Sequence, residues 1–517
     1  MQCGRSAWFP CADSAVKQAT WFTGTVTVFS AIGVWIATPT ESVMRTFIRP
    51  NACLASDSPR RKGWKEPPTR PCACLRRAQK LFQKRYLTSY RAFLGELGLI
   101  LLITFLLLGA CADGSSSSVR LAGRPGRWEL VRDGLPYVIR GAAGRDRLET
   151  LASIGGNSIR TWDAMDIDDL LDEAHRHGLS VTVGIWLEHE RHGFDYDDPQ
   201  VRRTQLEKVR TCVLKYRDHP AVLMWALGNE IELAGDMDKA LRAIEEAAAL
   251  TRQLDPHHPR MAVIAEIGQD KARRLREGCP SIDVLGINSY GGAPSLPKRL
   301  SAQGWTGPYV LTEFGPIGHW EGGHTPWGAP YEPSSADKAS MYLRAQTQGV
   351  MAEMPGRCLG SYAFMWGHKQ ETTPTWFGMF LESGERTAAV DVMQELWTGR
   401  PPADVAPAVH HLSLDAGPVF APRQTFRATC QSSDPEGKAL RMVWVVRPES
   451  TDPKSGGDAE QGTPDIPGAI MESGPEGAVV RAPGEPGAYR LYVTVFDDHG
   501  GAGTANIPFL VQAEQVE

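Results

Sequence analysis

The chain has 517 residues, enough for two or three domains, and 42% of them are hydrophobic, which supports a substantial core. Its 55 basic and 60 acidic residues give a formal net charge of −5, so no global positive field favours nucleic acid and we expect no nucleic-acid partner. Six of the ten cysteines fall at or before Cys111 and the other four are scattered singly, which is not the spacing of a disulfide framework.

The first clear feature in chain order is an apolar run over residues 97–108, preceded by basic residues and followed by Gly109, Ala110 and Cys111. This layout is typical of a secretory signal and is too short for a comfortable permanent span. The four residues 108–111 resemble the bacterial lipoprotein signal box. The resemblance implies a lipid anchor at Cys111, a tether ending at residue 118, and export to the bacterial cell envelope. Plain secretion or a plain membrane anchor is the alternative.

Residues 1–96 precede this signal and are rich in Arg, Lys, Pro and isolated Cys without a consistent period. Because a signal peptide normally starts a chain, we expect a poorly structured extension produced by an over-extended start. Met44 is the last methionine before Met165, so a shorter start would use another codon, near Leu87. The competing interpretation takes residues 21–38 as a membrane segment with the following basic stretch on the cytoplasmic side.

Residues 119–400 combine a short β lead-in with apolar strand-like runs that alternate with amphipathic helical stretches. The eight predicted strands are residues 137–141, 158–162, 180–186, 221–226, 261–265, 284–288, 309–312 and 360–366. Helix signals stand between them, such as Asp198 before Pro199 and Asp236 before a long periodic run. Eight such units predict an α/β fold, a (β/α)8 TIM barrel. A doubly wound open sheet is the alternative, but no Gly-rich phosphate turn follows any strand.

Two glutamates end two of these strands. Glu230 closes the Leu-Gly-Asn-Glu sequence after the fourth strand, and Glu313 lies in the Leu-Thr-Glu-Phe-Gly sequence at the end of the seventh. In a parallel barrel the carboxyl ends of the strands form the catalytic rim. Two carboxylates on one rim are what cleavage of a glycosidic bond requires, one to protonate the leaving oxygen and one to attack the anomeric carbon. Strand-end glutamates that are only solvated or paired are the alternative.

This arrangement, with an Asn before the first glutamate, resembles clan A retaining glycoside hydrolases, and most closely the catalytic barrel of family 2, over about residues 137–400. The resemblance implies Glu230 as acid/base and Glu313 as nucleophile, with their carboxyls about 5 Å apart. We therefore expect hydrolysis of β-linked O-glycosidic bonds in oligo- or polysaccharides by double displacement, without a cofactor or metal. The resemblance also places further residues in the substrate site: Arg160, Trp162, His189, Asn229, Tyr290 and Trp366.

Each of these residues has an expected task. Asn229 would hydrogen-bond the sugar 2-hydroxyl, Tyr290 would orient the nucleophile, Arg160 would lie beside it, and Trp366 would form a platform under the sugar. Core packing or a local salt bridge is the alternative for the last three. The loop over residues 189–198 concentrates imidazoles and carboxylates, but its spacing matches no standard metal-ligand set, so we interpret it as a polar rim or lid. Further substrate contacts are expected from Lys369, Gln370, Glu371 and Trp376.

Residues 405–517 change to short β-rich runs with Pro and Gly turns, which predict an Ig-like β-sandwich. The predicted strands are residues 425–430, 440–447, 477–481, 489–496 and 505–511. Two turns, at residues 433–437 and 496–501, resemble those of Ig-like modules in extracellular bacterial enzymes. Such a module binds glycan or calcium, or serves as a spacer or support for the barrel. Residues 456–467 are interpreted as a flexible insertion.

Two other functions fit the same sequence. Residues 157–160, 228–230 and 286–290 also resemble the β-1,3-glucan-remodelling transferases of the clan, in which a sugar instead of water accepts the covalent intermediate. A non-catalytic glycan-binding lipoprotein would keep the barrel without turnover. The presence of both glutamates favours the enzyme over the binding protein.

Overall fold

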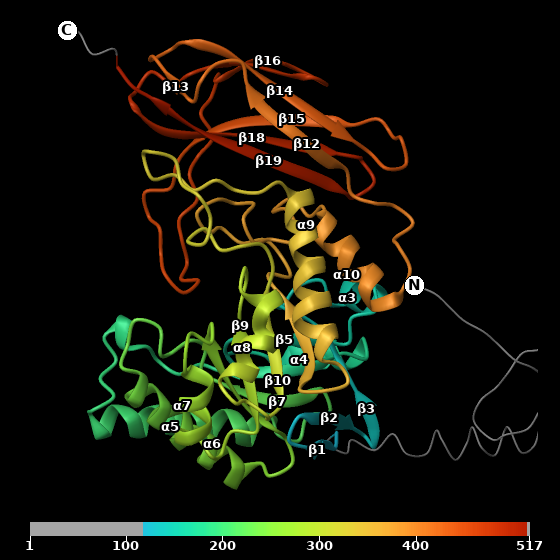
Figure 1. Cartoon of the computed structure of the whole chain (residues 1–517), viewed down its shortest axis with the longest axis vertical. Helices are drawn as coiled ribbons and strands as arrows, with labels where there is room; N and C mark the ends of the chain where they lie inside the picture. Colours follow the sequence, from blue (N-terminus) through green and yellow to red (C-terminus); the bar gives the residue numbers. More distant parts are fainter. Residues whose placement is uncertain (1–116, 514–517) are drawn as a thin grey trace, which may run out of the picture. The chain divides into compact units, whose positions relative to one another are not determined.

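The structure is a computed structural model that describes residues 117–513. The predicted extension, the signal and the lipid anchor at Cys111 lie outside the described residues. Within residues 117–513, no helix combines the length and the apolar character that a membrane crossing requires. The described chain forms a closed barrel of eight parallel strands followed by two four-stranded sheets. Figure 1 shows both sets of strands, with the two later sheets in orange to red. The predicted fold class is confirmed.

The barrel closes in the strand order β10-β11-β4-β5-β6-β7-β8-β9. Its strands are β4 (Ile139–Ala143), β5 (Ser158–Arg160), β6 (Ser180–Ile185), β7 (Val222–Leu227), β8 (Arg260–Ala265), β9 (Val284–Asn288), β10 (Tyr309–Phe314) and β11 (Cys358–Ala363). All eight predicted strands are present, with ends displaced by a few residues, because apolar runs identify a buried strand better than they identify its limits.

The α-helices that follow these strands, one after each, are α3 (Leu148–Ser153), α4 (Asp168–Arg176), α5 (Pro199–Tyr216), α6 (Met237–Leu254), α7 (Lys271–Gly278), α8 (Leu296–Ala302), α9 (Ser335–Arg344) and α10 (Ala388–Thr398). Helix α5 begins where the sequence predicts: the Asp198 side chain accepts hydrogen bonds from the backbone N–H of Gln200 and Val201, and Pro199 occupies the first turn. Helix α6 has an equivalent N-cap in Asp236.

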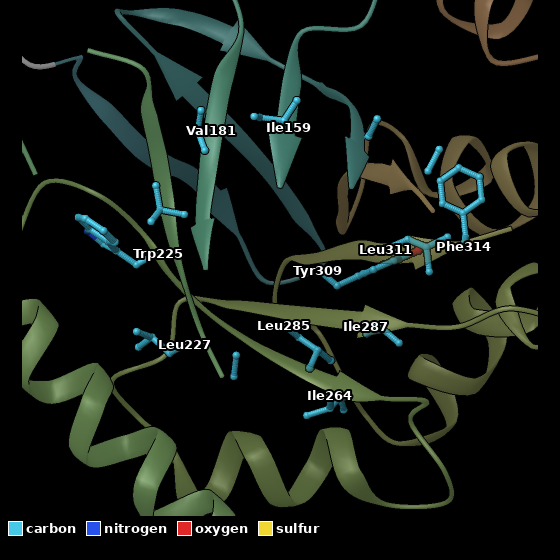
Figure 2. Close-up of a cluster of buried hydrophobic side chains, with 14 of the residues drawn as sticks. Ile159, Val181, Trp225, Leu227, Ile264, Leu285, Ile287, Tyr309, Leu311 and Phe314 are labelled. Atoms are coloured by element: carbon cyan, nitrogen blue, oxygen red, sulfur yellow. The ribbon is translucent and has the colours of Figure 1, made fainter. Parts of the chain in front are cut away.

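Buried side chains on the barrel strands alternate between two clusters. On β8, Met261 and Val263 belong to the cluster inside the barrel, whereas Ile264 belongs to the cluster shared with the helices. Figure 2 shows part of the second cluster, with Leu285 and Ile287 on the neighbouring strand β9. Because side chains fill the barrel interior, the interior itself leaves no room for a ligand.

The amino-terminal end of the barrel is covered by a small antiparallel sheet of β1 (Val119–Arg124), β2 (Arg127–Arg132) and β3 (Leu135–Tyr137). Val119 and Leu130 of this sheet belong to the same cluster as the barrel residue Met224. The Ser117 hydroxyl donates a hydrogen bond of 3.0 Å to the carbonyl of Val222 at the start of β7. The opposite end, where the strands end, carries Glu230 and Glu313.

The carboxy-terminal region is a β-sandwich of two sheets. One has the order β12 (Ala408–Leu414), β14 (Thr425–Ser433), β17 (Gly477–Arg481), β16 (Ile470–Gly474), and the other the order β13 (Val419–Phe420), β19 (Ala502–Val511), β18 (Gly487–Phe496), β15 (Arg441–Pro448). Their facing side chains form one core in which the rings of Phe420 and Phe426 stack with centroids 4.0 Å apart. The five predicted strands correspond to β14, β15, β17, β18 and β19.

Candidate active site

A pocket of about 690 Å³ lies at the carboxyl end of the barrel strands, within the range of small-ligand sites. The predicted residues in its wall are Trp162, Asn229, Glu230, Tyr290 and Glu313. Glu230 follows β7 and Glu313 lies near the end of β10, so two strands that are not neighbours bring their carboxyls to one cavity. Arg160, at the end of β5, lies behind this wall and donates hydrogen bonds to Glu313 and Asn229.

Three donors hold the carboxylate of Glu313. Arg160 Nη1 and Trp162 Nε1 donate to Oε1 at 2.9 and 2.8 Å, and the Tyr290 hydroxyl donates to Oε2 at 2.8 Å. Arg160 is only 1% exposed, so its charge acts on Glu313 with little screening. Burial, followed by the negative charge of Glu313, raises the pKa of Tyr290, which keeps the phenol protonated as a donor. These contacts stabilise Glu313 as an anion.

Glu230 has different surroundings. Its backbone adopts a left-handed conformation with φ of 53°, which is uncommon for a non-glycine residue. Asn288 Nδ2 donates a hydrogen bond of 2.7 Å to its Oε1, and no cation pairs with its carboxyl among the described residues. Burial, followed by the negative charge of Glu313, raises the pKa of Glu230 well above its usual range. The environment therefore favours a protonated Glu230 beside an ionised Glu313.

Asn229 lies in a hydrogen-bond chain between the two glutamates. Its Oδ1 accepts from Arg160 Nη2 at 2.6 Å and from Asn288 Nδ2 at 3.2 Å. The Thr312 hydroxyl in turn donates to Asn288 Oδ1 at 2.8 Å, which fixes the orientation of that amide. With its oxygen used in this way, Asn229 presents its NH₂ group as the donor to a ligand. Asn288 was not singled out from the sequence, although it occupies the end of a predicted strand.

The outer part of the pocket is aromatic. The loop after β10 contributes His319, Trp320 and Glu321, and Trp320 is 56% exposed with its ring 5.8 Å from that of Tyr290. Phe364 also lines the pocket. A half-exposed indole beside hydrogen-bonding groups suits stacking on a sugar face. Sequence reasoning missed this loop because it has no periodic pattern, and the adjacent His-Trp-Glu sequence was its only signal.

Two predicted site residues lie elsewhere. Trp366 is 0% exposed and packs edge to face on Phe380, with ring centroids 4.9 Å apart, so the predicted sugar platform is corrected to a core residue. Strand β11 ends at Ala363, and Phe364 takes the place at the pocket. His189 is also buried, and stacks on Trp186 at 4.9 Å instead of lining the cavity, which Trp186 does.

The buried ring of His189 supports the loop after β6 through a hydrogen bond. Burial, followed by the charge of Arg191, lowers the pKa of His189 to about 4, so the ring is neutral and Nδ1 accepts a hydrogen bond of 3.2 Å from Arg191 Nε. Among residues 117–513 no group of three or more His, Cys, Asp or Glu side chains is arranged to hold a metal ion. The polar loop that contains His189 instead makes ion pairs and hydrogen bonds.

The loop after β11 adds two of its four predicted contacts. Lys369 and Glu371 line the pocket, with Lys369 Nζ 3.4 Å from Glu371 Oε2. Burial raises the pKa of Glu371 to about 7, against the opposing effect of Lys369. Gln370 does not line the pocket, and Trp376 is buried in the core, where its Nε1 donates to the carbonyl of Ile317 at 2.9 Å.

Residues 156–324 match the family described as "Glycosyl hydrolases family 2, TIM barrel domain". The matched part of the barrel is similar to family 2. This segment runs from before β5 to beyond β10 and contains both Glu230 and Glu313. The side chains that donate hydrogen bonds to the two carboxyls all lie within this segment: Arg160, Trp162, Asn288 and Tyr290.

Individual relatives are more distant. A "Probable mannan endo-1,4-beta-mannosidase C" of Aspergillus terreus is 24% identical over 25% of this chain, and a beta-glucuronidase of Rattus norvegicus is 30% identical over 26% of it. The chain spans 38% and 20% of the length of these two proteins. A solved beta-D-glucuronidase of Dictyoglomus thermophilum has 19% identity and a TM-score of 0.44, covering 55% of this chain and 54% of that one. The family match and these curated relatives show that part of this chain is similar to glycosidases.

Proposed function

We propose that this protein is a retaining β-glycosidase that hydrolyses O-glycosidic bonds of oligo- or polysaccharides. The observation that carries the proposal is that two carboxyls in one pocket have opposite electrostatic surroundings. Glu313 accepts three hydrogen bonds, one from a buried arginine, whereas Glu230 has a raised pKa and no cationic partner among residues 117–513. One ionised and one protonated carboxyl are the nucleophile and the acid of a double displacement.

In the first step an oxygen of Glu313 attacks the anomeric carbon while the bond from that carbon to the leaving oxygen breaks. Glu230 gives its proton to the leaving oxygen, so the alcohol departs neutral and a glycosyl ester remains on Glu313. The Asn229 amide donates to the sugar 2-hydroxyl, a contact that strengthens as positive charge develops on the ring.

In the second step a water molecule attacks the anomeric carbon while Glu230, now ionised, takes a proton from it. The ester bond to Glu313 breaks, and the sugar leaves with its original anomeric configuration. The Arg160, Trp162 and Tyr290 donors stabilise the carboxylate that is regenerated. Glu230 is then protonated again and the cycle is complete.

Trapping of the covalent intermediate tests this proposal. Incubation with 2-deoxy-2-fluoro-β-D-glucosyl, -mannosyl and -glucuronyl fluorides should inactivate the enzyme and add one sugar to Glu313, as located by peptide mass spectrometry. The Glu313→Gln variant should take up no label. Azide should restore turnover of an aryl glycoside by Glu230→Ala, with a glycosyl azide of retained configuration as the product. Labelling of another residue, or a hydrolysis product of inverted configuration by NMR, would contradict the proposal.

A further inference from the structure

A long loop of the β-sandwich reaches the barrel loops. We name residues 449–469, between β15 and β16, the strap. Arg191, in the loop after β6, donates to the carbonyl of Ser455 at 2.8 Å and to both carboxylate oxygens of Asp458 at 2.5 and 3.1 Å. His192 Nε2 is 2.9 Å from the same carboxylate. This side of the strap is held by charge-assisted hydrogen bonds, which are the stronger kind.

The other side of the strap is held by the loop after β11. Lys369 Nζ donates to the carbonyl of Gly457 at 2.9 Å, and the backbone N–H of Thr372 donates to Glu460 Oε2 at 2.5 Å. The flexible insertion expected from the sequence is therefore corrected to a bridge between two barrel loops. Composition alone did not show this, because the partners come from residues far away along the chain.

The strap forms part of the pocket that contains the two glutamates. Its residues in the pocket wall are Lys454, Ser455, Gly456, Gly457 and Asp458. A Cβ atom on Gly456 would lie 3.3 Å from Leu233 Cδ2 and 2.8 Å from Arg191 Nη2, so the strap backbone packs closely on the loop after β7. Leu233 is part of the same turn as Glu230, since its N–H donates to the Glu230 carbonyl at 2.9 Å.

Because the strap packs next to the Glu230 turn, its position shows on which side of the cleaved bond it lies. In the proposed mechanism Glu230 protonates the leaving oxygen, so the wall next to the Glu230 turn faces the leaving group. We infer that the strap forms one wall of the leaving-group subsite and that the leaving group bound there is a sugar. This inference rests on the proposed function, because only the roles of Glu230 and Glu313 distinguish the two sides of the bond.

The chemistry of the wall favours a sugar. Lys454 pairs with Asp452, and Lys369 with Glu371 and the Gly457 carbonyl, but each ammonium has three N–H donors. Their remaining donors and the peptide groups of Gly456 and Gly457 can hydrogen-bond a ligand, and Trp186 offers an apolar ring. Sugar hydroxyls can hydrogen-bond to the polar groups, and the apolar face of a sugar can stack on the Trp186 ring. An apolar leaving group would desolvate these polar groups without pairing them, which discriminates strongly against it.

The two steps of the mechanism separate this role from a merely structural one. The leaving group has departed before water attacks, so hydrolysis of the glycosyl ester does not need its subsite. Transfer of the ester to a second sugar does need it, because the acceptor occupies the place that the leaving group vacated. A change in the strap should therefore slow transfer and leave hydrolysis of the trapped enzyme as it was.

The experiment uses the full chain inactivated by whichever of the three fluorosugars labels Glu313. Recovery of activity is measured in buffer alone and with added methyl β-D-glucopyranoside as acceptor. In the wild type the acceptor should speed recovery. Replacement of residues 453–461 by Gly-Ser-Gly should reduce the acceptor-dependent rate about tenfold or more, while recovery in buffer changes less than about twofold. The Lys454→Ala variant should also reduce the acceptor-dependent rate more than the rate in buffer, but by a smaller factor. It replaces the shortened strap in the test if that variant does not fold.

Glu472→Gln, an exposed carboxyl on β16 outside the strap, is the control and should recover like the wild type. Equal loss of both recovery rates in the strap variants would show a structural role only and overturn the inference. An acceptor that never speeds recovery of the wild type, or one that acts equally on all variants, would also overturn it. If no fluorosugar labels Glu313, the proposed function itself fails, which is a different result from labelling without a strap effect.

Discussion

The neighbours of Glu230 make its proton the pH-sensitive part of the site. A carboxyl with a raised pKa is protonated below that pKa and loses its proton as the pH rises through it. Glu230 therefore acts as an acid at neutral pH and becomes unable to protonate a leaving oxygen at higher pH. Its buried position and the negative charge of Glu313 both contribute in this direction.

We predict that kcat/KM for a substrate with a sugar leaving group falls on the alkaline side and that Glu230→Gln removes this dependence. The same variant should lower kcat/KM about 10²- to 10⁴-fold, because general acid catalysis is lost. A 2,4-dinitrophenyl glycoside needs no proton on its leaving oxygen, so its kcat/KM should change far less. Rate measurements across the pH range with both substrates check this, and an unchanged alkaline limb in Glu230→Gln would contradict it.

The site residues that could be predicted from the sequence are those that lie at or just after the end of a strand. Glu230, Glu313, Tyr290 and Arg160 follow or end apolar runs, and the barrel brings them together. Trp366 was misplaced because the chain changes direction after β11, and a sequence does not show which face a side chain takes beyond the strand end. Asn288 and the loop with Trp320 needed the three-dimensional neighbours that give them a function.

At the scale of elements, burial decides which strands the sequence reveals. The eight barrel strands are covered on both faces and appear as apolar runs. The sandwich strands that were not predicted, β12, β13 and β16, all lie at sheet edges and are short or polar. Edge strands are kept this way because a long apolar edge would pair with other chains. Their absence from the prediction has a physical cause.

The starts of α5 and α6 were predictable because one aspartate side chain caps each of them. The Asp198 carboxylate accepts from Gln200 N at 2.7 Å, so Asp198→Ala should destabilise the protein by about 1 kcal/mol, the usual cost of losing an N-cap. Asp198→Asn keeps an acceptor at the same place and is the matched control. Urea unfolding followed by circular dichroism checks the difference. Equal midpoints for the two variants would show that the cap contributes nothing to α5.

At the scale of the whole molecule, buried charges join the sandwich to the barrel. Glu332, in the loop before α9, accepts hydrogen bonds from Lys338 and from Asn506 Nδ2 of β19, the latter at 2.7 Å. Arg490 of β18 is fully buried and donates to Asn506 Oδ1 at 2.7 Å and to the Pro330 carbonyl at 2.7 Å. The spacer expected as one alternative for the sandwich would not need such a network, so barrel support is the better description.

The same network holds the first residue of the strap, since Arg490 Nε lies 2.9 Å from Glu449 Oε1. Arg490→Met should therefore destabilise the protein by about 3–5 kcal/mol, because it leaves the largely buried carboxylate of Glu449 without its partner. It should also increase proteolytic cleavage within the strap. Arg441→Ala on β15 removes a solvent-exposed pair with Asp498 and should cost less than about 1 kcal/mol. Thermal unfolding and limited proteolysis compare the two variants. If Arg490→Met unfolds and is cleaved like Arg441→Ala, the sandwich is held by its apolar contacts alone, and the strap keeps its place without the buried charges.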